Sequence, residues 1–63
     1  MNWYAVQESR GDPWDYGSYS YEKALRMLID QGEGLIAVIE KGNCKQEIAY
    51  EDVCPFNGTH KAV

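Results

Sequence analysis

Apolar and polar residues recur with different periods along the chain, and each change of period marks a new segment. Residues 2–8, NWYAVQE, are rich in aromatic and β-favouring side chains. They precede SRGDP, where Gly11 and Pro13 interrupt regular structure. We predict a strand from Asn2 to Glu8. A loop over residues 9–19 follows it.

The next segment has the period of a helix, because its apolar residues are spaced to line one helix face. These residues are Tyr21, Ala24, Leu25, Met27 and Leu28. Ser20 is suited to cap the first turn, and Gly32 is suited to end the last one. The pattern predicts a helix from Tyr21 to Gln31. A helix this short requires packing against another element.

Residues 34–50, GLIAVIEKGNCKQEIAY, have the pattern of a β-hairpin. We predict strands from Leu35 to Glu40 and from Cys44 to Tyr50. Between them Lys41, Gly42 and Asn43 form the turn, since Gly and Asn accept positive φ. The run LIAVI is apolar at every position, which is typical of a central strand covered on both faces.

Together these segments predict an α+β fold in the order β-α-β-β, with one helix packed on a three-stranded sheet. If the first two strands are adjacent, a right-handed crossover through the helix makes them parallel. If the first strand lies beside the third, the sheet is fully antiparallel. The apolar run favours a central second strand, so we predict the mixed sheet. We expect residues 1–52 to form this domain and residues 53–63 an irregular tail, whose first part can dock.

The predicted sheet is apolar on both faces but has only one helix to cover them. Leu35, Ala37 and Ile39 point to one face, whereas Ile36 and Val38 point to the other. One face therefore needs a further cover.

Three alternatives exist for what packs on that face. The loop could lay Trp14 or Tyr16 on the sheet, or the tail could dock through Val53, Pro55 and Phe56. A second copy or another protein could also supply the missing layer. An apolar face left uncovered by the chain itself is typical of a partner site.

Charge narrows the choice of partner. The 63 residues carry a net charge of −4, and the six basic residues form no run. Attraction to nucleic acid or to an anionic membrane is disfavoured, so we expect a protein partner or self-association. No apolar run approaches the ~20 residues of a membrane span. MNWYAVQESR lacks a signal-peptide pattern, so we expect a cytoplasmic protein.

Catalytic patterns are missing from the sequence, and we expect neither an enzyme nor a bound cofactor. The one histidine, His60, is the fourth residue from the end. Cys44, Cys54 and His60 are widely spaced and include no Cys-x-x-Cys pair, so we predict no metal site. Two cysteines fit a reducing compartment. A Cys44–Cys54 disulfide stays an alternative if the tail turns back along the last strand.

The loop before the helix carries the best candidates for a binding surface. They are Asp12, Trp14, Asp15, Tyr16 and Tyr19. Tyr and Trp offer large, rigid contact areas with one polar tip, and acidic neighbours suit a basic partner. Structural roles are the alternative: Asp12 and Asp15 can bond to turn amides, and Trp14 can close the core.

The segment DPWDYGS, followed by an EKA helix start, resembles short uncharacterised proteins of bacteria and their phages that contain a DxWDxGS segment. The matching residues are Asp12, Trp14, Asp15, Gly17, Ser18 and Ala24. The resemblance covers about residues 2–50. It implies a small bacterial or mobile-element domain and carries no assigned activity or functional residue.

Two functions follow as expectations. The first is a small non-enzymatic protein-interaction module that presents the uncovered sheet face or the aromatic loop. The second is an acidic inhibitor or nucleic-acid mimic that occupies a basic protein surface, which requires Glu8, Asp12, Asp15 and Glu22 to lie on one surface.

Overall fold

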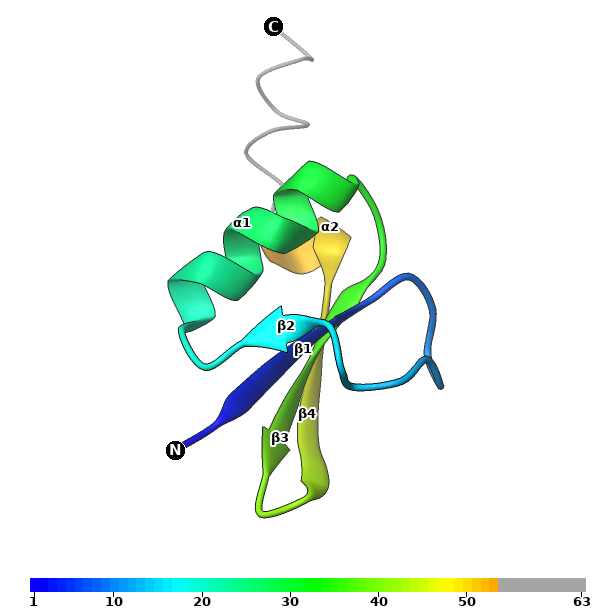
Figure 1. The fold of residues 1–63 in the computed structure, drawn as a ribbon. Helices are drawn as coiled ribbons and strands as arrows, with labels where there is room; N and C mark the ends of the chain where they lie inside the picture. The colour runs from blue at the N-terminus through cyan, green and yellow to red at the C-terminus, as the bar shows by residue number, and fades with distance from the viewer. Residues whose placement is uncertain (54–63) are drawn as a thin grey trace, which may run out of the picture.

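The chain folds as one main helix packed on a four-stranded antiparallel sheet with the order β2-β1-β3-β4 (Figure 1). This computed structural model describes residues 1–53. The elements are β1 (Trp3–Gln7), β2 (Gly17–Ser18), α1 (Tyr21–Gln31), β3 (Leu35–Glu40), β4 (Asn43–Ala49) and α2 (Tyr50–Val53). The α+β class is as predicted, but the sheet has one strand more than expected.

The additional strand is β2, which lies inside the segment predicted to be a loop. It consists of only two residues and runs antiparallel to β1, with Tyr4 opposite Ser18 and Ala5 opposite Gly17. Two residues are too few to show the alternation by which a strand is recognised in sequence. The chain therefore returns along β1 before the helix begins.

The prediction that the first two long strands are parallel is wrong. β1 and β3 are adjacent but antiparallel, with Trp3 opposite Ile39 and Gln7 opposite Leu35. β2 first carries the chain back along β1, and α1 then crosses in the opposite direction, so β3 begins beside the end of β1. The expectation that Leu35–Glu40 is a central strand is confirmed, because β3 lies between β1 and β4.

The helix forms where the sequence predicts it, with both ends capped. The Ser20 backbone is extended, and its hydroxyl accepts a hydrogen bond from the Lys23 amide at 3.3 Å. At the other end Gly32 takes a left-handed conformation with φ 84°, and its amide donates to the Leu28 carbonyl. Ala24 and Leu28 are fully buried, so the predicted apolar stripe faces the sheet.

The hairpin differs from the prediction in its turn and register. Its turn is the pair Lys41 and Gly42, both with positive φ, and β4 already begins at Asn43. Val38 lies opposite Gln46, but Ile39 lies opposite Cys44, so Lys45 has no opposite residue and forms a bulge.

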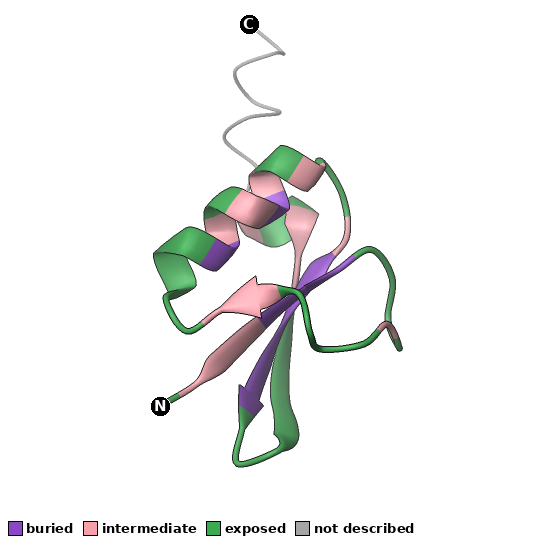
Figure 2. Cartoon of the chain, in the orientation of Figure 1, coloured by how far each residue is buried: buried purple, intermediate pink, exposed green. Residues whose placement is uncertain are grey.

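The sheet buries residues on both faces (Figure 2). On the helix face, Val6 and Ile36 pack with buried residues of α1. On the opposite face, called the far face below, Ala5, Ala37 and Ile39 form a second cluster with the half-buried Trp3. Ala5 is 0% and Ala37 1% exposed, so the far face is closed at its centre.

The described chain ends in a helical turn, which begins at Tyr50, where the last strand was predicted to end. β4 stops at Ala49, and α2 covers Tyr50–Val53. Tyr50 and Val53 pack against the cluster on the helix face, so Val53 does not cover the far face as one prediction had it. Pro55 and Phe56 lie outside the described residues.

Gly17 allows the close approach of β2 to β1. A Cβ atom at this position would overlap the Tyr4 carbonyl oxygen and lie 2.9 Å from the Ala5 Cα. Both neighbours are backbone atoms of a paired strand, so they cannot move away by a change of rotamer as a side chain could. A larger residue therefore forces the two strands apart.

We predict that Gly17→Ala lowers the free energy of unfolding by about 1–3 kcal/mol, the usual cost of overpacking. Urea denaturation of both proteins measures it. Gly11→Ala is the control, because a Cβ there meets nothing within 4 Å, although φ is 98°. A loss at Gly17 no larger than that at Gly11 would contradict the role of the close approach.

Candidate functional site

The segment between β1 and β2, residues 8–16, is called the return loop, and hydrogen bonds tie it to the far face and the edge of β1. The Gln7 side-chain amide donates to the Asp12 carbonyl, and the Trp3 indole donates to the Trp14 carbonyl at 2.6 Å. Both donors stand on the far-face side of β1. At the strand edge, the Val6 amide donates to the Tyr16 carbonyl at 2.7 Å.

One ion pair connects the return loop with the other edge of the sheet. Arg10 Nε lies 2.7 Å from Glu47 Oε1, and Glu47 stands opposite Ala37 on the far face. The Arg10 side chain is 78% exposed, so this pair adds little stability. The loop thus supplies part of the far-face cover, mainly through its backbone.

Asp12 holds the loop in shape. Its carboxylate accepts hydrogen bonds from the amides of Glu8 and Ser9, both at 3.1 Å. This is the turn chemistry that the sequence offered as the structural alternative for Asp12. Asp12 therefore has a local structural role, whether or not it also contacts a partner.

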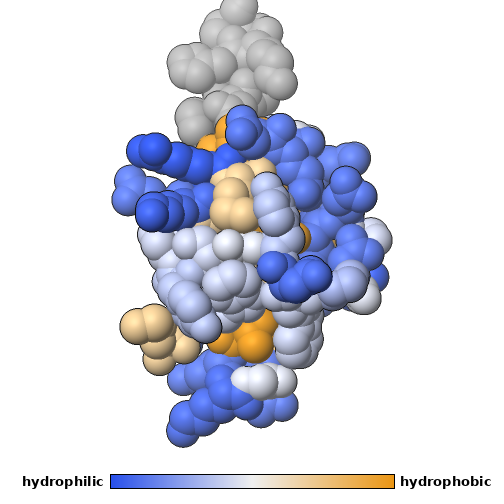
Figure 3. All heavy atoms as spheres, viewed as in Figure 1, coloured by the Kyte–Doolittle hydropathy of each residue, from blue (hydrophilic) through white to orange (hydrophobic). Residues whose placement is uncertain are grey.

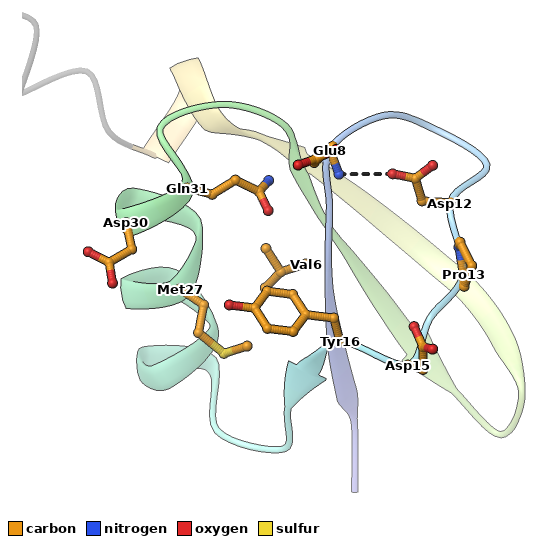
Figure 4. Close-up of a pocket in the computed structure, with 9 residues that line it drawn as sticks. All are labelled: Val6, Glu8, Asp12, Pro13, Asp15, Tyr16, Met27, Asp30 and Gln31. Carbon is orange, nitrogen blue, oxygen red and sulfur yellow. Dashed lines mark hydrogen bonds between the residues drawn. The ribbon is translucent and has the colours of Figure 1, made fainter.

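The aromatic candidates separate into two groups. Trp14 contributes its carbonyl to the cover, while its side chain is 41% exposed. Tyr19, 62% exposed, packs edge-on against Trp3 with ring centroids 4.8 Å apart. Tyr16 belongs to a different surface, where its ring lies between β1 and α1 (Figure 4).

That surface is an open hollow of about 520 Å³ between the return loop, β1 and the last turns of α1. We call it the acidic hollow. It is lined by Val6, Glu8, Asp12, Pro13, Asp15, Tyr16, Met27, Asp30 and Gln31. Figure 4 shows Tyr16 across the middle, Met27 and Asp30 on the helix, and Asp12, Pro13 and Asp15 on the loop.

Hydrogen bonds to backbone carbonyls fix the walls of the acidic hollow relative to one another. The Gln31 side-chain amide donates to the Gln7 carbonyl at 3.0 Å and to the Glu33 carbonyl at 2.6 Å. This joins the end of α1 to the end of β1. The bond from Val6 to Tyr16 joins the loop to the same strand. The hollow is thus built on regular elements as well as on a loop.

Among the described residues, all charged side chains that line the hollow are acidic: Glu8, Asp12, Asp15 and Asp30. Within residues 1–53 the one ion pair is that of Arg10 with Glu47, so none of these four carboxylates is neutralised there. Asp30 lies in the last turn of α1, which contains no basic residue. The negative end of the helix dipole therefore adds to the charge of the carboxylates.

The structure brings together three of the five predicted site residues. Asp12, Asp15 and Tyr16 line the acidic hollow, whereas Trp14 and Tyr19 do not. Glu8, Met27, Asp30 and Gln31 were not predicted as site residues. Asp30 could have been found from the sequence, because a carboxylate in the last turn of a predicted helix opposes the helix dipole.

Cys44, Cys54 and His60 are the residues on which a metal site or a disulfide would depend. Among residues 1–53, no three side chains of His, Cys, Asp or Glu come close enough together to hold a metal ion. Cys44 is exposed and forms no disulfide with any of residues 1–53. Cys54 and His60 lie outside the described residues, so neither the Cys44–Cys54 disulfide nor the wider ligand set is tested.

The remaining surface offers no comparable feature in the view of Figure 3. Apolar atoms appear there only in small, separate areas among polar ones. In the part of the chain that the structure describes, neither helix has the length and apolar character needed to cross a membrane.

Comparison with known proteins found no matching family model, no matching curated protein and no matching solved structure. The resemblance to short bacterial and phage proteins therefore stays a prediction.

Trp3 and Trp14 are expected to differ sharply in their effect on stability. Trp3→Ala removes the indole hydrogen bond and packing on the far face, at a cost of roughly 2–3 kcal/mol. Trp14→Ala leaves the Trp14 carbonyl in place and costs less than about 1 kcal/mol. Thermal and urea unfolding of both variants measure the difference. Equal losses would show that the Trp14 side chain is the main cover of the far face.

Proposed function

We propose that this protein is a small non-enzymatic interaction module that binds a protein partner through the acidic hollow. The observation that carries the proposal is the hollow itself, in which an exposed aromatic ring stands among carboxylates without an ion-pair partner in the described chain. Tyr16 is 53% exposed, although its loop is hydrogen-bonded to β1. A large ring held in an open position at little entropic cost is typical of binding hot spots.

A heterologous partner is favoured over a second copy of the chain. The edge strand β2 has only two residues, and the other edge, β4, is interrupted by the bulge at Lys45. Short and bulged edges resist pairing between sheets. Two copies that met at the acidic hollow would also bring like charges together.

The second candidate is an acidic inhibitor or nucleic-acid mimic. It requires a continuous acidic surface, and Glu8, Asp12 and Asp15 do line one hollow. Glu22 stands in the first turn of α1 and does not line the hollow. The fourth acidic residue of the lining is Asp30. This local arrangement suits a few inserted groups better than the long, regular charge pattern of a nucleic acid.

Affinity capture from an extract of the source cells tests the proposed function. We expect the wild-type protein to retain a partner that Tyr16→Ala loses and that Tyr19→Ala keeps. Both substitutions remove an exposed tyrosine of the same segment, but only Tyr16 lines the hollow. A partner retained equally by wild type and Tyr16→Ala would show that binding occurs elsewhere.

A further inference from the structure

We infer that the acidic hollow receives an arginine side chain of the partner. This inference rests on the proposed function and names the chemistry that the site recognises. It starts from the walls of the hollow, which are apolar and aromatic at their centre, with Val6, Tyr16 and Met27 side by side (Figure 4). An arginine side chain has an apolar stem and a charged planar head, so it matches both parts of such a surface.

The charge of the hollow decides the sign of its occupant. The carboxylates come from two parts of the fold: Glu8, Asp12 and Asp15 belong to the return loop, and Asp30 belongs to α1. Among residues 1–53, no basic side chain lines the hollow. An anionic group would be repelled by these carboxylates, whereas a cation would be attracted by them.

Tyr16 favours a guanidinium over a more compact cation. Its ring is exposed and extends from the return loop toward α1, in a lining that includes carboxylates of the loop and Asp30 of the helix (Figure 4). A guanidinium group stacks on an aromatic face and donates to carboxylates in its plane at the same time. A metal ion is less suited, because no three potential ligands among residues 1–53 converge.

Asp30 gives an independent argument for a binding role. A carboxylate in the last turn of a helix opposes the helix dipole, and α1 has no basic residue there to compensate. No hydrogen bond or ion pair of the Asp30 side chain occurs within residues 1–53. A residue whose local interactions are unfavourable, and that gains no compensating contact in the fold, is expected at functional positions. A cation in the hollow would supply the missing compensation.

The test is an NMR titration of the full chain with Nα-acetyl-arginine amide at low ionic strength. Nα-acetyl-citrulline amide, which has nearly the same shape but no charge, is the control ligand. We expect saturable shifts of the Met27 methyl group and of the Tyr16 and Asp30 signals with the arginine probe. The citrulline probe should give none, and added salt should weaken the binding.

Two matched variants separate local from general electrostatics. Asp30→Asn and Asp52→Asn remove the same charge, but Asp52 lies in α2, outside the hollow. We expect about threefold weaker binding of the probe for Asp30→Asn, as for loss of one partly exposed ion pair. Asp52→Asn should bind like wild type. Asp30→Asn should also unfold at the same or a higher temperature, because it removes an unfavourable dipole interaction.

Several outcomes would overturn the inference: no saturable shift, equal shifts with the citrulline probe, or equal effects of the two variants. If Asp30→Asn fails to fold, Asp15→Asn on the exposed loop serves in its place. Failure of the arginine probe while capture still depends on Tyr16 would remove the arginine inference alone. Capture that does not depend on Tyr16 would remove the proposed function and this inference with it.

Discussion

The fold depends on the close return of the chain along β1. The contact of Gly17 with the backbone of Tyr4 and Ala5 lets a two-residue strand pair where any side chain would collide. This reversal sets the direction of α1 and makes β3 antiparallel to β1. It also closes the return loop, so the far face is covered and Tyr16 is placed beside the helix. The shape of the candidate site thus follows from the backbone contact at Gly17.

Much of this architecture could be predicted from the sequence because it rests on local signals. The helix is marked by its apolar stripe, by Ser20 and by Gly32, and its bounds agree with the prediction. The apolar run of β3 indicated a central strand. β2 could not be predicted, because two residues carry no period and its pairing is a long-range contact. Without β2 the strand direction was misjudged, although each longer segment was identified correctly.

The candidate site was likewise predictable only where it depends on residues close together in the sequence. The aromatic and acidic loop was predicted to be a binding surface, but sequence proximity grouped residues that the fold separates. Trp14 and Tyr19 lie toward Trp3, whereas Tyr16 lies toward α1. Asp30 comes 14 residues after Tyr16 in the chain. It lines the hollow only because α1 lies beside β1 and runs in the same direction. Gly17 and Asp12 maintain the shape of the segment, whereas the side chains of Tyr16 and Asp15 make no hydrogen bond or ion pair within residues 1–53 and are the residues proposed to contact a partner.

The most direct test of this account is amide hydrogen exchange at Val6. Its amide donates to the Tyr16 carbonyl at 2.7 Å, which fastens the return loop to β1 beside the acidic hollow. A bond opened only by unfolding of the sheet protects its amide nearly as well as the amides of the central strand. The account predicts that Val6 exchanges within about tenfold of the rate at Ile36, which corresponds to roughly 1.4 kcal/mol in opening free energy. Exchange of Val6 at the rate of an unstructured peptide, with Ile36 protected, would contradict it.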